Sequence, residues 1–249
     1  MKKNKEDTVI YLYGLTKASP SRGAKLHGTQ GVAELETIRC GGFDCWISRV
    51  PRTEFADNLV TNMENLDWLT TVGVAHQRAV SAIAKAKDVI PARLGTIFLN
   101  DASLCSNVEE RKANLRADLK RIQSTEEWGI KVFAVAPGNL RTSPRPKTGR
   151  AYLQAKSALL PRPGSVEKSE ELETFSKALK ELSKSQAAGG KISAGQRHLR
   201  FQVSLLLRRG DRKKLEATVR RFSKEWRNIF KVECTGPWPP YSFISPRTE

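Results

Sequence analysis

Residues 199–207 alternate between apolar and polar side chains, and this pattern restricts how the surrounding chain can fold. In LRFQVSLLL, every second residue from Leu199 onward is apolar, whereas Arg200 and Gln202 lie between them. Successive side chains of a strand point to opposite faces. The segment therefore predicts a strand with one buried face and one face open to solvent or to a partner.

Segments typical of helices and strands alternate on both sides of this strand. After residue 126 the expected order is strand, helix, strand, helix, strand, at 128–137, 167–185, 199–207, 211–227 and 229–234. A further helix is plausible at 151–160. With one more short strand between 187 and 197, which the sequence does not reveal, this half would form a ferredoxin-like α+β unit.

The first half also predicts a mixture of strands and helices. Residues 8–15 are apolar on both faces, as in a central buried strand. Residues 32–38 and 43–50 predict a hairpin about Gly41-Gly42. Thr53 is a candidate cap for the next helix, which carries Phe55, Leu59, Met63 and Leu66 at near-helical spacing. Asp101 or Ser106 begins a later helix, and Ser106 with Glu109 fits a capping box. The expected fold class is α+β, with an N-terminal domain at 1–125 and a C-terminal domain at 126–249, because 249 residues can fill two cores.

Positive charge is concentrated in the second half. The formal net charge is +17, and residues 126–249 hold 25 of the 43 lysines and arginines but only 12 of the 26 acidic residues. Such an excess predicts an acidic partner for this half, or a solvated basic face that binds nothing. The helix at 211–227 carries much of this charge on one face, and Leu215, Val219, Phe222 and Trp226 form an apolar stripe on its other face.

The cysteines and histidines do not predict a metal site. Cys40 and Cys45 form a lone pair around Gly41-Gly42, Cys105 and Cys234 stand apart, and the three histidines lie far from the pair in sequence. A zinc site needs about four clustered ligands. No stretch is apolar enough to span a membrane, and we expect a cytoplasmic protein without a secretory signal.

Catalytic motifs are also missing, and we expect neither an enzyme nor a cofactor. No phosphate-binding loop, dinucleotide fingerprint, nucleophile elbow or metalloprotease motif occurs. His76 lies on the apolar stripe of its expected helix, which favours a hydrogen-bonded core residue over a general base. The adjacent pairs Glu109-Glu110 and Glu126-Glu127 are expected on solvated helix faces.

Arg93 is the one charged residue in the apolar segment VIPARLGTIF at 89–98. A buried guanidinium must be paired or must reach a surface. We favour an ion pair that joins two elements, and a role in binding a partner is the alternative.

The segment TGPWPPYSF at 235–243 places Trp238, Tyr241 and Phe243 among prolines that restrict the backbone. These aromatics could fold back over the last strand, since large aromatic side chains bury much apolar area. Alternatively, part of the segment stays exposed and binds a partner. We retain Trp238, Tyr241, Phe243 and Arg93 as candidate partner-binding residues.

Five motifs occur in an order that resembles the gas vesicle protein GvpF/GvpL family over nearly the whole chain. They are YLYG at 11–14, the histidine-bearing helix with VIPARLGTIF at 89–98, EW-x-x-K-V at 127–132, GRAYL at 149–153 and TGPWPPYSF at 235–243. The chain departs from the family pattern at His76-Gln77, where the family usually has His-Glu, and at Ala92 and Leu94 around Arg93.

The resemblance implies a non-enzymatic role in forming gas vesicles. It implies two α+β domains, the second a modified ferredoxin-like unit, and binding to the small shell protein and to other accessory gas vesicle proteins. It places the protein at the gas vesicle in the cytoplasm, with no small-molecule substrate and no membrane partner. The alternative function is a basic nucleic-acid-binding module. The sequence lacks a recognised nucleic-acid-reading motif to support it.

Overall fold

A computed structural model describes residues 7–19, 35–135, 170–188, 198–227 and 229–245. The chain divides into two compact units. Unit 1 comprises Met1–Trp128, Leu206–Arg209 and Gly236–Glu249, and unit 2 comprises Gly129–Leu205 and Gly210–Thr235. The expected boundary at 125/126 thus differs from this division mainly at the C-terminal segment, which groups with unit 1. The expected helix at 151–160 and the GRAYL motif lie outside the described residues.

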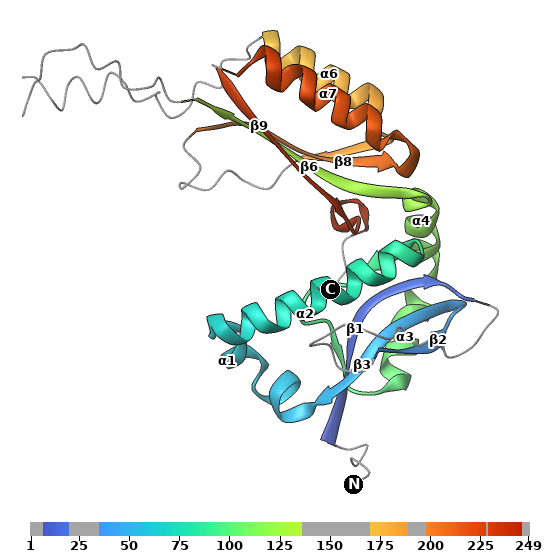
Figure 1. Ribbon diagram of the computed structural model, residues 1–249. Helices are drawn as coiled ribbons and strands as arrows, with labels where there is room; N and C mark the ends of the chain where they lie inside the picture. The colour runs from blue at the N-terminus through green and yellow to red at the C-terminus, as the bar shows by residue number, and fades with distance from the viewer. Residues whose placement is uncertain (1–6, 20–34, 136–169, 189–197, 228, 246–249) are drawn as a thin grey trace, which may run out of the picture. The chain divides into compact units, whose positions relative to one another are not determined.

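Unit 1 is built on an antiparallel sheet with the strand order β2-β3-β1-β4, and β5 also pairs with β1. Its strands are β1 (Thr8–Lys17), β2 (Glu36–Cys40), β3 (Phe43–Pro51), β4 (Val89–Pro91) and β5 (Ile97–Phe98). Figure 1 shows β1 and β3 as the long central pair. The expected hairpin is confirmed, with Gly41 and Gly42 both at positive φ in its turn.

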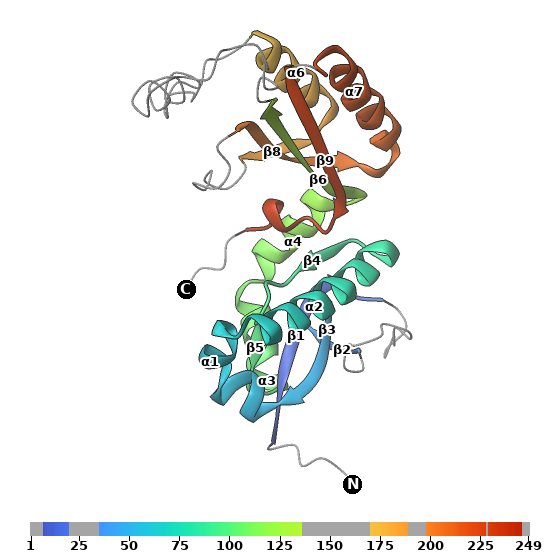
Figure 2. The same ribbon diagram turned by 60° about the vertical axis from the view of Figure 1, so that its left-hand side comes forward.

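Helices cover both faces of this sheet (Figure 2). They are α1 (Leu59–Glu64), α2 (Leu66–Ala86), α3 (Asp101–Glu110) and α4 (Lys112–Ile122). Strand β1 is apolar on both faces because α2 packs on one side and α3 and α4 lie on the other. Val9, Tyr11 and Tyr13 belong to the core that includes Val80 and Ile83 of α2.

Of the two candidate starts of the later helix, Asp101 is confirmed and Ser106 is not, and the expected helix cap at Thr53 was wrong. The side chain of Asn100, just before α3, accepts a hydrogen bond from the backbone of Ser103, and Ser103 completes the capping box. Thr53 begins a short π-helix, Thr53–Asp57, in place of a capped α-helix. The capping box of Asn100 and Ser103 satisfies free backbone groups at the start of α3, whereas no side-chain cap is present at the start of the π-helix.

A disulfide joins the hairpin to α3. Cys40, at the end of β2, is bonded to Cys105, and their Cα atoms are 4.9 Å apart although 65 residues separate them. The sequence interpretation treated Cys105 as unpaired because it compared only cysteines close in sequence. Cys45 remains a buried free thiol, and burial raises its pKa to about 12.

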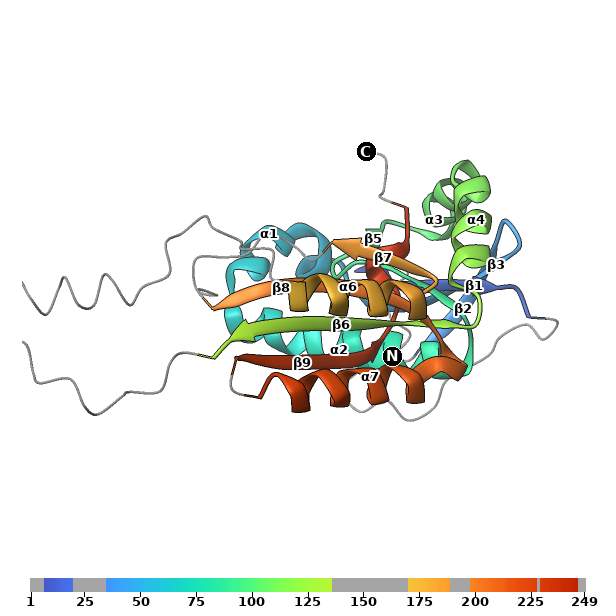
Figure 3. The ribbon, with the colours of Figure 1, turned by 90° about the horizontal axis from the view of Figure 1, so that it is seen from above.

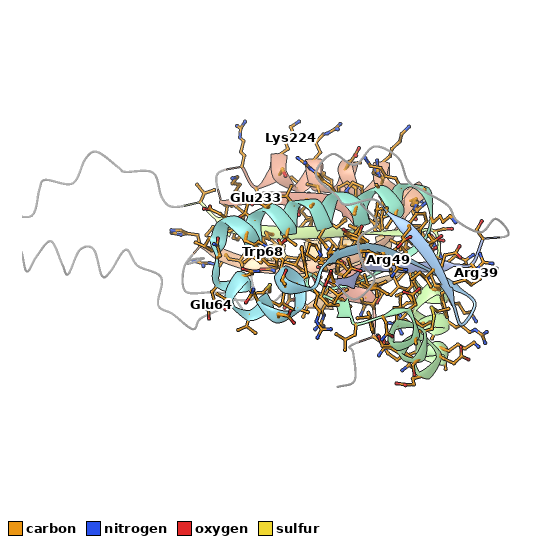
Figure 4. All side chains as sticks on the ribbon, turned by 90° about the horizontal axis from the view of Figure 1, so that it is seen from below. Arg39, Arg49, Glu64, Trp68, Lys224 and Glu233 are labelled. Carbon is orange, nitrogen blue, oxygen red and sulfur yellow. A yellow bond between two sulfur atoms is a disulfide. The ribbon has the colours of Figure 1, made fainter. Side chains whose placement is uncertain are left out.

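Salt bridges hold the hairpin to its surroundings. Arg39 pairs with Asp44, and Arg49 pairs with both Glu36 and Asp101. Figure 4 labels both arginines along the hairpin. The Arg49–Asp101 pair adds a second link, besides the disulfide, between this hairpin and α3.

Unit 2 contains a four-stranded sheet with the order β7-β8-β6-β9 (Figure 3). Its elements in chain order are β6 (Thr125–Ala134), α6 (Glu170–Leu182), β7 (Ser185–Ala188), β8 (Leu199–Arg208), α7 (Arg212–Glu225) and β9 (Phe230–Trp238). Strands β6, β8 and β9 and helices α6 and α7 correspond to the expected ones. Strand β7 overlaps the first two residues of the region 187–197, where one more short strand was considered.

An aromatic cluster fills the space between this sheet and the two helices, which lie side by side on one face (Figure 2). Phe175 of α6 is fully buried and contacts the rings of Phe201, Phe222 and Trp226. Trp226 also contacts Phe230 of β9. The apolar stripe expected for α7 is therefore confirmed at Leu215, Phe222 and Trp226.

Candidate partner-binding site

The C-terminal segment 236–245 packs against unit 1. It continues from the end of β9 through a short 3-10 helix, Tyr241–Phe243, and Phe243 is buried. Its contacts reach α2, α4 and the start of β6. The segment therefore helps to build unit 1, although residues 129–235, most of which belong to unit 2, separate it from Trp128.

The first anchor of the segment is a hydrogen-bond network around His76. The Nε2 atom of His76 lies 3.1 Å from the carbonyl oxygen of Ala92, which can only accept, so Nε2 carries the proton. The Nδ1 atom then accepts from the hydroxyl of Tyr11 at 2.9 Å. The hydroxyl oxygen of Tyr241 lies 3.2 Å from Nε2 and shares that proton.

This environment makes His76 a structural residue. Burial lowers the pKa of His76 to about 4, although the hydrogen bond to Ala92 opposes the change. The imidazole is therefore neutral at physiological pH, and it is hydrogen-bonded to a carbonyl and to two tyrosine hydroxyls. The prediction of a hydrogen-bonded core histidine is confirmed.

The second and third anchors are buried carboxylates. Glu127 accepts hydrogen bonds from the backbone N–H of Ser242 at 2.9 Å and from its hydroxyl at 2.6 Å. Asp118 accepts from the backbone N–H of Ser245 at 3.0 Å and from its hydroxyl at 2.9 Å. Arg121 pairs with Asp118 at 3.0 Å and donates to the carbonyl of Phe243 at 2.8 Å.

The expectation that Glu126-Glu127 lies on a solvated helix face was wrong. Both residues are buried at the start of β6. Glu126 accepts from the indole N–H of Trp128 at 2.9 Å, and Glu127 holds Ser242. A buried carboxylate needs such partners, and they come from sequence positions that periodicity does not connect.

Gly236 allows the segment to approach β6 closely. Its φ is +142°, and a Cβ atom there would lie 2.9 Å from the carbonyl oxygen of Glu127 and 3.0 Å from the ring of Trp128. A side chain would collide with backbone, so the position requires glycine.

The structure places the three candidate aromatics differently. Phe243 is buried, Tyr241 is half-buried with its hydroxyl at His76, and burial raises the pKa of Tyr241. Trp238 keeps 44% of its surface exposed. Of the three, Trp238 is the one whose side chain is available to a partner.

Arg93 lies near the same segment, at a cavity of about 310 Å³. The cavity has apolar walls from β1, β4 and β5, and Ile244 and Ser245 also line it. The Arg93 side chain is exposed, and no carboxylate pairs with it in the part of the chain that the structure describes. The ion pair that we favoured from the sequence is therefore not observed there. Arg93 and the C-terminal segment meet at one cavity.

Four exposed apolar side chains lie on the adjacent helices α1 and α2, which the sequence did not indicate. They are Val60, Met63, Leu66 and Val74, exposed by 79%, 40%, 76% and 45%. We call these four residues the α1–α2 apolar surface. Met63 and Leu66 were expected on a buried stripe. Instead α1 ends at Glu64, and Asn65 caps a new helix, so the periodicity does not continue across the junction.

Helix α7 presents a basic outer face. Its side chains Lys213, Arg220, Arg221 and Lys224 are exposed, and Lys224 points away from the helix (Figure 4). The inner face is apolar, so the pattern is that of an amphipathic helix whose outer side favours acidic partners.

Neither a metal site nor a membrane helix is present in the described ranges. No three His, Cys, Asp or Glu side chains there are grouped closely enough to hold a metal ion. No helix there is long and apolar enough to cross a membrane.

The sequence missed Asp118, Glu127, Ser242 and Ser245, the polar residues that hold the C-terminal segment. One signal was available: Glu127 begins a run, EWGIKVFA, that otherwise reads as a buried strand. A charged residue at such a position predicts a specific partner. The identity of that partner depends on the tertiary fold.

Comparisons with known proteins agree with one another. The family model for gas vesicle synthesis protein GvpL/GvpF matches residues 9–245. Gas vesicle protein L from Streptomyces sp. (strain CB03234) is 27% identical over 255 residues, covering 95% of this chain and 93% of that protein.

Two solved structures share the fold. The crystal structure of GvpF from Anabaena sp. PCC7120 covers 97% of this chain with a TM-score of 0.69, and GvpF from Microcystis aeruginosa covers 96% with the same score. Both are 14% identical to this chain, so they support the fold alone. The family match spans nearly every residue and includes the anchored C-terminal segment, and the chain belongs to the gas vesicle synthesis protein GvpL/GvpF family.

Proposed function

We propose that this protein is a non-enzymatic accessory or minor structural component of gas vesicle formation that binds the small shell protein. Membership of the GvpL/GvpF family supports a role in gas vesicle formation. The binding of the shell protein is the further step. It is supported by one observation, the α1–α2 apolar surface.

The exposure of this surface carries the proposal. More than three quarters of Val60 and of Leu66 is open to solvent. Clustered exposed apolar residues commonly mark a protein interface, because their burial against a partner removes apolar area from water. A shell protein that builds an apolar wall offers a matching surface and needs an escort before assembly. Trp238 and Arg93 are further candidates for the same contact.

Co-expression with the major shell protein tests the proposal. The double variant Val60→Asp/Leu66→Asp places charge on the α1–α2 apolar surface and should abolish pull-down of the shell protein and lower vesicle yield. The control is Thr61→Asp/Thr70→Asp, which adds the same charges at exposed positions of the same helices. Equal pull-down by both doubles would contradict the proposal.

The ferredoxin-like interpretation of unit 2 is also a proposal. Its support is the element order β6-α6-β7-β8-α7-β9 together with the sheet order β7-β8-β6-β9. In this arrangement two helices cover one face of the sheet. The second domain would then run from β6 to the end of β9.

A nucleic-acid-binding module is the second candidate, and the exposed basic face of α7 favours it. Such binding would be driven by phosphate contacts and would weaken steeply with salt. A gel-shift experiment with generic RNA at physiological ionic strength separates the candidates. Lys213→Glu/Lys224→Glu should abolish any shift that α7 causes, and absence of a shift by the unmodified protein removes this candidate.

A further inference from the structure

We propose that a cavity in unit 1, separate from the C-terminal segment, binds the phosphate groups of a small polyphosphate anion. The cavity has a volume of about 630 Å³, which is the size of a small-molecule site. Four cationic side chains line it: Lys17, Lys87, Arg116 and Lys120. We call it the basic cavity. This inference is independent of the gas vesicle role.

Three different parts of unit 1 supply these cations. Lys17 ends β1, opposite Phe43 of β3. Lys87 follows the last residue of α2. Arg116, Leu119 and Lys120 lie on α4 at the spacing i, i+3, i+4 that forms one face of a helix, and Gln123 follows the end of α4. Leu115, Asp118 and Ile122 of α4 are buried, whereas Arg116 and Lys120 line the cavity.

Acidic residues do not balance this charge. Among the described residues, the one carboxylate that lines the cavity is Asp88. It already accepts hydrogen bonds from the backbone N–H of Ser124 and from Arg209, each at 3.1 Å. Lys17, Arg116 and Lys120 form no ion pair with any residue in the described ranges. The Nζ atom of Lys87 lies 5.8 Å from the ring centroid of Trp46, which is a cation–π contact.

The preference of helix C-termini for cations explains the positions of only two of the four cationic side chains. Cations are favoured at helix C-termini, and this accounts for Lys87 after α2 and for Lys120 in the last turn of α4. It does not account for Lys17, at the end of a strand, or for Arg116, in the middle of α4. Like charges four residues apart on a helix are destabilising. An anion between Arg116 and Lys120 would remove that repulsion.

The residues fit phosphate groups well. Lysine provides a compact point charge, and arginine provides a fork of donors that matches phosphate oxygens. The hydroxyl of Ser19 and the side-chain amide of Gln123 add neutral donors on the same lining. Charges that surround one volume favour a compact multivalent anion, such as a chain of two or three phosphates. A single flat row would instead favour an extended acidic chain.

Calorimetric titration of the full chain with tripolyphosphate at low salt tests the inference. Arg116 and Lys120 are exposed, so Arg116→Gln/Lys120→Gln should fold normally, which the melting temperature checks. Two charge-assisted contacts are lost, and we expect the affinity to fall at least about tenfold. Arg116→Lys/Lys120→Arg should retain binding.

The matched control is Lys213→Gln/Lys224→Gln on α7, which removes the same charge far from the basic cavity in sequence and should leave the affinity within about twofold. Equal losses in both doubles, or no binding of tripolyphosphate at about millimolar concentration, would overturn the inference. Tighter binding of an oligoglutamate peptide than of tripolyphosphate would also overturn it. Titration with adenosine triphosphate and with adenosine then distinguishes a nucleotide from a free polyphosphate.

Discussion

The hydroxyl oxygen of Tyr241 lies 3.2 Å from Nε2 of His76, across 165 positions of the sequence. His76 already donates to Ala92 and accepts from Tyr11. Residues within the first 92 positions thus already provide a hydrogen-bond partner for each ring nitrogen of His76. Tyr241 adds a second acceptor for the proton on Nε2. The contact joins the C-terminal segment to the core of unit 1 through the tip of a half-buried ring.

Substitution of Tyr241 and Trp238 should separate anchoring from binding. Tyr241→Phe removes one hydrogen bond and should lower the free energy of unfolding by about 1 kcal/mol. Trp238→Ala removes an exposed side chain and should change it by less than about 0.5 kcal/mol. Chemical denaturation measures both values.

Pull-down of the shell protein provides the second readout for these variants. If Trp238 contacts the partner, Trp238→Ala weakens the pull-down while the unfolding curve stays unchanged. A large loss of stability in Trp238→Ala would show that this side chain is an anchor, as Tyr241 is.

Acidification should destabilise unit 1 through His76. The pKa of His76 is about 4 in the folded protein, against about 6.5 in an unfolded chain. Between these values the unfolded state binds more protons, so stability is complete above the unfolded pKa and decreases as the pH falls toward 4. The loss between about pH 7.5 and pH 5 is about 2 kcal/mol from this residue.

Denaturation of His76→Gln at the same two pH values isolates this contribution. Glutamine can donate to the carbonyl of Ala92 but does not titrate. The variant is expected to be less stable at neutral pH and to lose about 2 kcal/mol less than the unmodified protein on acidification. An unchanged pH dependence would show that other groups control it.

Loss of the Asp118 carboxylate should release the C-terminal segment. Asp118 is buried and holds both Ser245 and Arg121. Removal of one member of a buried, hydrogen-bonded ion pair costs about 3 kcal/mol, and the cost here is reduced because Arg121 is partly exposed. Asp118→Asn is expected to increase cleavage by a protease within 236–245, read by mass spectrometry.

Ser245→Ala is the milder comparison for Asp118→Asn. It removes the hydroxyl donor but keeps the backbone N–H of residue 245. Cleavage should therefore increase less than in Asp118→Asn. The reverse order would mean that Asp118 acts elsewhere.

The Cys40–Cys105 disulfide should contribute substantially to unit 1. It closes a loop of 65 residues, for which chain entropy predicts a stabilisation of about 4 kcal/mol. Cys105→Ser should lower the free energy of unfolding by about 2 to 4 kcal/mol. A reducing agent should have the same effect on the unmodified protein and none on the variant. The free thiol Cys45 serves as a control, because Cys45→Ser leaves the disulfide intact.

Much of the secondary structure could be predicted because local patterns determine it. The alternation at 199–207, the Gly41-Gly42 turn and the apolar stripe of α7 each depend on residues close in sequence. The same patterns identified the order of elements in the second half. Strand β7, with the sequence SQAA, has no such pattern, because its residues are small or polar and its pairing with β8 defines it.

The candidate site was less predictable because tertiary contacts build it. The motif containing Trp238, Tyr241 and Phe243 is visible in the sequence, but its position on unit 1 depends on Asp118, Glu127 and His76. Each lies at least 100 residues away from the serine or tyrosine that it contacts. The disulfide and the α1–α2 apolar surface were missed for the same reason, since spacing gives no information about distant partners or about a helix that ends early.

The division of unit 1 into early and late parts of the chain has a consequence for biosynthesis. Residues 129–205 and 210–235 must be translated before 236–245 can reach His76, Asp118 and Glu127. Until then, the carboxylates of Glu127 and Asp118 lack the hydrogen-bond donors that Ser242 and Ser245 provide. Completion of unit 1 is therefore delayed until residues 236–245 have been translated.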